Sequence, residues 1–149
     1  MKRIRLLVTV TFLALIQSCG GSSPSTSTPT PTPTPRPTPI VISQVNRTLS
    51  ADYFYRNLIV TNQVGTLTLQ LNWTYAANQM LVGIATSDCT IEAYQQRNCA
   101  FLAQDASPSS VPTKTLTITN LAVGTYTVIV SNWGPGDESY TYIVTLAPN

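Results

Sequence analysis

The 149-residue chain contains no histidine and few charged residues, with eight basic and six acidic side chains. Histidine is the commonest general base in enzymes and the usual activator of serine and cysteine nucleophiles, so its absence argues against catalysis. After the basic residues at positions 2, 3 and 5, the chain also has no cluster of lysine or arginine that would attract phosphate groups. We therefore expect no nucleic-acid partner.

The acidic residues offer little basis for a hydrolase. Asp137 and Glu138 are adjacent in the sequence. In an extended strand neighbouring side chains point to opposite faces, so these two carboxylates cannot easily flank a scissile bond at the separation that glycosidases need. We expect a protein without enzymatic activity, and a hydrolase remains the weaker alternative.

Residues 1–18 have the three parts of an export signal. Basic residues at positions 2, 3 and 5 precede an apolar stretch from Leu6 to Ile16, and small residues follow it. This stretch is about half as long as the roughly 20 apolar residues of a membrane-spanning helix. Without residues 1–18, five basic residues stand against six acidic ones, so the mature chain is nearly neutral.

The segment Ile-Gln-Ser-Cys-Gly at residues 16–20 resembles the lipobox of bacterial lipoproteins. The resemblance implies cleavage before Cys19 and attachment of a diacylglyceryl group to its sulfur, with acylation of the new amine. Each buried CH₂ contributes about 0.8 kcal/mol, so two or three acyl chains hold a protein on a bilayer that it does not cross. We expect a lipid-anchored protein of the cell envelope, at the outer membrane or cell surface, with its domain outside the cytoplasm.

The chain has only three cysteines. If Cys19 is lipidated, Cys89 and Cys99 remain as a pair in a compartment where disulfides persist. We predict that they are bonded, which contributes about 2–3 kcal/mol in the chain-entropy model. Two thiolates without histidine do not make a structural zinc site, so we expect no metal there.

Residues 19–39 are rich in serine, threonine and proline, with Thr-Pro repeats from residue 28 onward. Proline fixes φ and lacks an amide donor, so such a segment favours extended polyproline II over a folded core. About 18 residues of this kind span roughly 50 Å. We expect a lipidated cysteine and a disordered tether over residues 19–39, and one folded domain over residues 40–149.

From residue 40 onward, apolar and polar residues alternate with the period of half-buried β-strands. The alternation is clearest at residues 66–73, where three leucines and Trp73 share one face. Other strands are predicted at residues 115–119, 126–130 and 140–146, and weaker ones at 40–45, 54–61 and 80–86. We therefore expect an all-β fold, a jelly-roll-like antiparallel β-sandwich of about seven to eight strands.

Residues 69–73 (LQLNW), 116–118 (LTI), 122–132 (AVGTYTVIVSN) and 140–144 (YTYIV) together resemble the bacterial pre-peptidase C-terminal domain. The resemblance covers about residues 48–147. It implies a small β-sandwich that serves exported proteins as a non-catalytic module, in secretion or in binding insoluble protein or polysaccharide. Some members bind calcium, but the acidic residues that typically follow the tryptophan strand are missing after Trp73, so we expect no cofactor.

In a binding module, exposed aromatic residues on loops are the first candidates for ligand contact. Trp133 precedes a Gly-Pro-Gly turn, and Asp137 and Glu138 in the same loop supply acceptors for hydroxyls or a cation. Trp133 has an alternative role, which is to cap one end of the sandwich. Tyr75 is a further candidate, whereas Trp73 ends an apolar face and is expected in the core.

The predicted disulfide loop, residues 90–98, is polar and contains Tyr94, two glutamines and Arg97. Covalent closure lowers the entropy cost of ordering such a loop on binding. We expect a binding or adhesive module for polysaccharide or for an envelope or extracellular protein. A structural role in envelope assembly or secretion, through pairing of exposed sheet edges, stays open as the alternative.

Overall fold

The computed structural model describes residues 37–149. The predicted signal peptide, Cys19 and most of the predicted tether lie outside these residues. In chain order the elements are β1 (Ile40–Leu49), β2 (Phe54–Thr61), β3 (Gly65–Trp73), β4 (Met80–Thr86), α1 (Ile91–Gln95), β5 (Phe101–Asp105), β6 (Thr113–Leu121), β7 (Gly124–Asn132) and β8 (Glu138–Pro148). None of the helices in this range is long and apolar enough to span a membrane.

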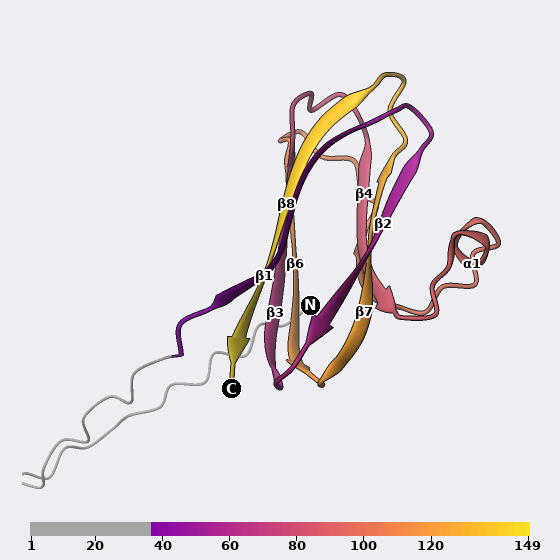
Figure 1. Cartoon of the computed structure of the whole chain (residues 1–149). Helices are drawn as coiled ribbons and strands as arrows, with labels where there is room; N and C mark the ends of the chain where they lie inside the picture. Colours follow the sequence, from indigo (N-terminus) through magenta and orange to yellow (C-terminus); the bar gives the residue numbers. More distant parts are fainter. Residues whose placement is uncertain (1–36) are drawn as a thin grey trace, which may run out of the picture. The chain divides into compact units, whose positions relative to one another are not determined.

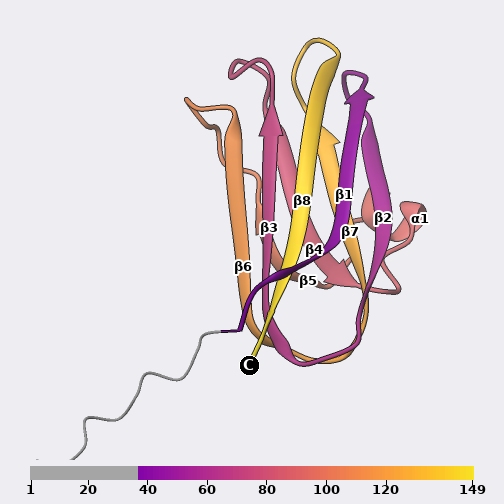
Figure 2. The same cartoon turned by 60° about the vertical axis from the view of Figure 1, so that its left-hand side comes forward.

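The eight strands form two four-stranded antiparallel sheets that face each other (Figures 1 and 2). Sheet I has the strand order β1-β8-β3-β6, and sheet II has the order β2-β7-β4-β5. The chain passes from one sheet to the other at nearly every connection, and only β4 and β5 are consecutive strands of the same sheet. Eight strands in this order form a jelly roll, which confirms the predicted fold class.

The main core lies between the sheets and follows from the alternation in the sequence. Leu67, Leu69 and Leu71 of β3 point inward and are fully buried. Tyr140 and Tyr142 of β8 are buried beside them, and their rings stack with centroids 6.5 Å apart. Burial raises the pKa of both phenols. Trp73, at the end of β3, is buried in this core, as predicted.

Strand β4 differs from β3 because six of its seven residues are buried. Val82 and Ile84 belong to the main core, whereas Leu81 and Ala85 belong to a separate apolar cluster. A strand with apolar side chains on both faces must be covered on both sides. The outer side of sheet II is therefore covered by another part of the chain, described below.

Strand β5 is the one strand within residues 37–149 that was not predicted from the sequence. It has five residues, of which Leu102 and Gln104 are exposed while the others are half-buried. Its pairing with β4 also shifts register between Ile84 and Ala85. So short and irregular a strand leaves too weak an alternation to detect.

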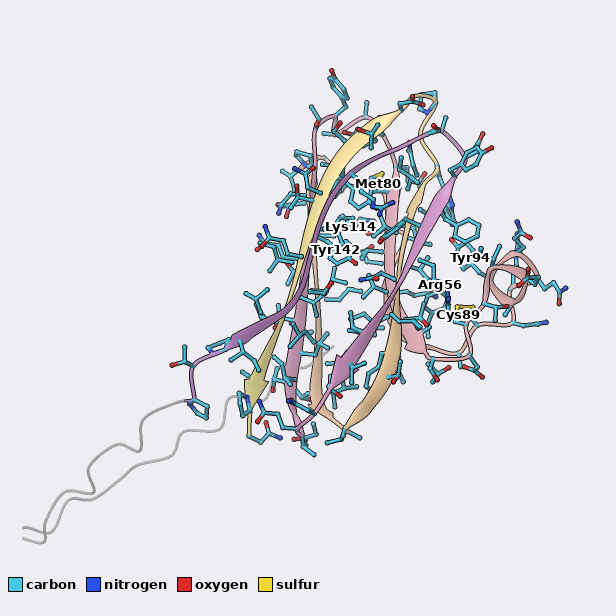
Figure 3. All side chains as sticks on the ribbon, in the orientation of Figure 1. Arg56, Met80, Cys89, Tyr94, Lys114 and Tyr142 are labelled. Atoms are coloured by element: carbon cyan, nitrogen blue, oxygen red, sulfur yellow. A yellow bond between two sulfur atoms is a disulfide. The ribbon has the colours of Figure 1, made fainter. Side chains whose placement is uncertain are left out.

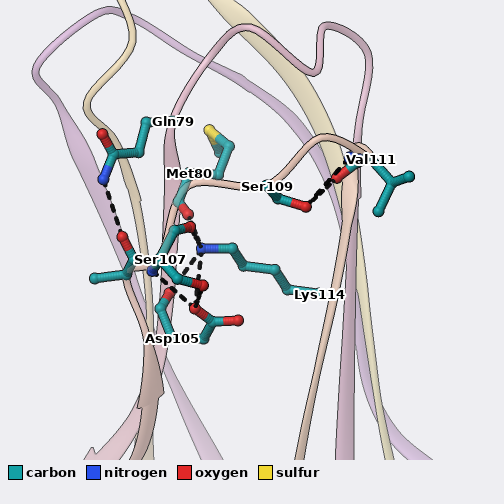
Figure 4. A network of polar contacts seen from close by, with 8 residues as sticks. Gln79, Met80, Asp105, Ser107, Ser109, Val111 and Lys114 are labelled. Carbon is teal, nitrogen blue, oxygen red and sulfur yellow. Dashed lines mark hydrogen bonds and ion pairs between the residues drawn. The ribbon is translucent and has the colours of Figure 1, made fainter.

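A buried lysine joins the two sheets at one edge (Figure 4). The ammonium group of Lys114, on β6, donates hydrogen bonds to the backbone oxygens of Met80 (2.7 Å), Asp105 (3.1 Å) and Ser107 (2.7 Å). It also lies 3.3 Å from the carboxylate of Asp105. Hydrogen bonds from Ser107, with a contribution from Lys114, lower the pKa of Asp105. The buried charge is thus fully paired, as burial of an ammonium group requires.

Candidate binding site

The loop between β4 and β5 contains the predicted disulfide. Cys89 and Cys99 are bonded, with their Cα atoms 4.9 Å apart. The five-residue helix α1 lies inside this loop, and Thr90 caps its N-terminus by accepting a hydrogen bond from the amide of Ala93 (3.1 Å). We call residues 89–99 the disulfide loop.

The disulfide loop packs on the face of sheet II that points away from sheet I (Figure 3). Its residues join Leu81, Ala85 and Ile129 of the sheet in the second apolar cluster. Arg56 of β2 ties the loop to the sheet, because its Nε donates to the backbone oxygen of Cys89 (2.7 Å). The loop is therefore a fixed part of the fold and covers the outer face of β4.

Aromatic side chains line the contact between loop and sheet. The ring of Tyr94, from α1, lies 4.8 Å from that of Phe54 and 6.4 Å from that of Phe101. Phe101 in turn lies directly over Gly83 of β4, where any Cβ would overlap its ring. Glycine at this position lets the aromatic ring approach the backbone of β4 closely.

The loop after β7 is held by a separate network of hydrogen bonds. The buried amide of Asn132 donates to the backbone oxygens of Leu49 (3.1 Å) and Gly136 (2.8 Å), and its oxygen accepts from the amide of Gly134 (2.9 Å). The amide of Trp133 donates to the backbone oxygen of Gln79 (2.8 Å). The backbone at Trp133 is thus fixed, while its side chain remains 49% exposed.

The disulfide loop and Trp133 meet at a surface pocket of about 580 Å³. Its lining combines three aromatic rings with aliphatic, amide and guanidinium groups, from Leu81, Tyr94, Gln95, Arg97, Cys99, Phe101, Gln104 and Trp133. This volume lies within the range of small-molecule and sugar-sized sites, which are mostly apolar with a few polar groups. The loop at Trp133 and the disulfide loop, which were predicted as separate candidates from the sequence, therefore form one candidate site.

Glu138 is not part of this site, and its predicted role as a surface ligand is wrong. Its side chain is fully buried. One carboxylate oxygen accepts from the amide of Thr74 (2.7 Å), the other from the side-chain amide of Asn78 (2.7 Å), and both from the amide of Tyr75 (3.3 and 3.2 Å). Glu138 thus organises the loop between β3 and β4 and has no free face for a ligand.

The remaining two candidates are on the surface but do not line the pocket. Asp137 is exposed, and Tyr75 is 63% exposed on the loop between β3 and β4. A smaller hollow of about 230 Å³ lies near this loop, on sheet I. Its two aromatic residues, Trp73 and Tyr140, are buried in the core, so polar side chains form its exposed surface. The pocket at Trp133 is the better candidate because its aromatic groups are accessible.

Residues 37–149 contain no group of three or more histidine, cysteine, aspartate or glutamate side chains placed to hold a metal ion. None of the acidic side chains near the two candidate loops lines the pocket: Glu138 accepts hydrogen bonds from backbone amides, and Asp88, Glu92 and Asp137 are exposed. The arrangement at the pocket therefore favours contact through aromatic faces, amides and one guanidinium.

No family model and no curated protein matches the chain, so the resemblance to the pre-peptidase C-terminal domain gains no support from these comparisons. Among solved structures, one similar chain is a periplasmic inhibitor of g-type lysozyme from Aeromonas hydrophila, with 8% identity, a TM-score of 0.46 and coverage of 70% of this chain and 84% of that chain. Another is a carbohydrate-binding module from Cellvibrio mixtus lichenase 5A, in complex with cellotriose. It has 8% identity, a TM-score of 0.43 and coverage of 70% and 97%. At TM-scores below 0.5, neither similarity carries an argument about function.

Proposed function

We propose that this protein is a non-catalytic binding module of the bacterial cell envelope, and that its ligand is a polysaccharide bound at the pocket between Trp133 and the disulfide loop. The observation that carries the proposal is the convergence of these two loops on one pocket. Each loop is fixed by its own restraint, a disulfide in one case and the Asn132 network in the other. A pocket that is already ordered loses little entropy on binding.

The chemistry of the lining supports a sugar ligand. The exposed indole of Trp133 offers a flat apolar face for the C–H face of a sugar ring, a contact that contributes about 1 kcal/mol beyond area burial if aromatic pairing is a guide. The half-buried ring of Tyr94 adds apolar surface to the same lining. The exposed carboxamides of Gln95 and Gln104 provide both donors and acceptors for hydroxyl groups. With no histidine in the chain, no step of chemistry on the ligand is proposed.

The proposal extends to the rest of the chain, whose sequence supports an exported lipoprotein. In this proposal residues 1–18 are a signal peptide, residues 19–39 are a lipidated cysteine and its tether, and residues 40–149 are the binding domain. Many tethered copies on one membrane would bind a polymer by avidity even if each contact is weak. Substitution of Cys19 by alanine should move the protein from the membrane fraction to the soluble fraction. Unchanged partition into membranes would refute the anchor.

A retention assay tests the site. The full chain, in mild detergent, is passed over cell walls and a panel of insoluble polysaccharides. We expect retention on at least one of them, with loss of retention for Trp133→Ala and no loss for Tyr75→Ala, which removes an exposed aromatic residue outside the pocket. Equal retention of the two variants, or no retention of the wild-type chain, would overturn the proposed function.

A further inference from the structure

Arg97 is the one charged residue among the eight that line the pocket, and none of the eight carries a carboxylate. Within residues 37–149, the one ion pair is that of Lys114 with Asp105, so the guanidinium of Arg97 has no acidic partner there. Arg56, on the neighbouring strand β2, already donates to the backbone oxygens of Ser87 and Cys89. Arg97 is thus the guanidinium that the pocket presents for an incoming group.

The backbone at Arg97 adopts a conformation that arginine rarely takes. After α1, the amide of Arg97 donates to the backbone oxygen of Tyr94 (3.0 Å), and that of Asn98 donates to the backbone oxygen of Ala93 (2.8 Å). This pair of bonds is the Schellman motif, in which the left-handed position is usually glycine. Arg97 occupies it with φ of 60°.

The choice of arginine at this position is not explained by local folding. Two other non-glycine residues within 37–149 have positive φ, and they are Asp52 and Asn120, residue types that tolerate it well. Arginine carries the steric penalty of a Cβ in the left-handed region, with no local hydrogen bond from its side chain to offset the penalty. Non-glycine residues held in such backbone conformations cluster at active sites and ligand-binding sites.

The charge of the whole domain does not by itself attract anions. Residues 37–149 have four basic side chains, at positions 47, 56, 97 and 114, against six acidic ones, so their net charge is −2. Lys114 is buried and fully bonded. Binding of an anionic polymer would therefore depend on a local group and would not arise from a general electrostatic field.

We propose that the pocket binds a sugar unit that carries a carboxylate, as in a polysaccharide containing uronic acids. This inference rests on the proposed function and names its ligand class. The planar guanidinium of Arg97 matches a carboxylate in two parallel hydrogen bonds. The carboxamides of Gln95 and Gln104 bind the sugar hydroxyls, and the indole of Trp133 packs on the C–H face of the ring.

The test compares matched polymers that differ in charge alone. The full chain in mild detergent is titrated with polygalacturonate, alginate and hyaluronan, and with the carboxyl-reduced derivative of each. We expect at least one acidic polymer to bind ten or more times tighter than its reduced form, with weaker binding at high salt. Arg97→Gln should remove this difference, whereas Arg47→Gln, which removes an arginine outside the pocket, should leave it unchanged.

A second variant separates loss of carboxylate binding from loss of folding. Arg97→Gly relieves the backbone strain of the Schellman motif, so its thermal midpoint should equal or exceed that of the wild-type chain, while its preference for the acidic polymer is lost. Acidic binding that survives in Arg97→Gly would overturn the inference.

The outcomes separate this inference from the proposed function. If the acidic and reduced polymers bind equally and Trp133→Ala abolishes both, the polysaccharide site stands and the carboxylate inference falls. If no polymer binds, both fall. If short peptides with a free C-terminal carboxylate bind through Arg97 while no polysaccharide does, the carboxylate is recognised on a protein ligand and the sugar class is wrong.

Discussion

Trp133 and Arg97 line the same pocket although they belong to different loops with independent supports. Trp133 follows β7, where the buried amide of Asn132 fixes the loop. Arg97 follows α1 inside the loop closed by Cys89 and Cys99. The two sides of the pocket can therefore be disturbed separately, one through a hydrogen-bond network and the other through a covalent bond.

Removal of the disulfide tests the side formed by α1. In the double variant Cys89→Ser and Cys99→Ser, we expect the free energy of unfolding to fall by about 2–3 kcal/mol, the amount expected for a closed loop of this length. Retention on the ligand should fall at least tenfold, because the loop is no longer closed covalently and its residues at the pocket lose their fixed positions. Urea unfolding and the retention assay measure the two effects. Full retention by the double variant would show that the loop's order does not matter for binding.

Substitution of the buried Lys114 should change the free energy of unfolding and not the pocket, which Lys114 does not line. Lys114→Met keeps an unbranched side chain of similar length but leaves the backbone oxygens of Met80 and Ser107 without their partner. We expect a loss of about 2–5 kcal/mol in unfolding free energy, in line with breaking a buried charged network. Thr115→Ala, on the exposed face of the same strand, should change it by less than about 0.5 kcal/mol. A loss below about 1 kcal/mol for Lys114→Met would contradict this account of the network.

Asp137 and Glu138 are adjacent in the sequence but differ in burial, so the stabilities of their amide variants can be compared directly. Glu138→Gln conserves shape, but its amide nitrogen must face hydrogen-bond donors from Thr74, Tyr75 or Asn78. We expect a loss of about 1–3 kcal/mol in unfolding free energy for Glu138→Gln and almost none for the exposed Asp137→Asn. Neither should alter ligand retention while the chain is folded. Equal stability of the two variants, measured by thermal unfolding, would be inconsistent with a structural role for Glu138.

The strands with regular alternation could be predicted from sequence because the pattern itself records which face is buried. The leucines of β3 and the tyrosines of β8 lie in the core for that reason. The pairing of Cys89 with Cys99 followed from cysteine number and compartment. These predictions depend on local pattern or on counting, and not on long-range packing.

Other features depend on contacts that no local pattern contains. Glu138 and Lys114 look like surface residues by type, yet both occupy inward positions of strands and are buried, Glu138 with hydrogen bonds from amides and Lys114 with hydrogen bonds and an ion pair to Asp105. Lys114 lies two residues before the buried Leu116 and therefore on the same inward face of β6. The strand period thus favoured burial of Lys114, but its charge argued against placing it in the core. Likewise, nothing near Trp133 in the sequence indicates that α1 lies across the pocket from it.

The thermal stability and ligand retention of Trp133→Ala, measured together on the full chain, test the central claim most directly. Because the Trp133 side chain is 49% exposed, we expect a thermal midpoint within a few degrees of the wild-type value and at least a tenfold loss of retention. Truncation of a buried aromatic residue costs about 3–5 kcal/mol. A loss of stability of that size, or undiminished retention, would show that Trp133 serves the fold and that the pocket is not the binding site.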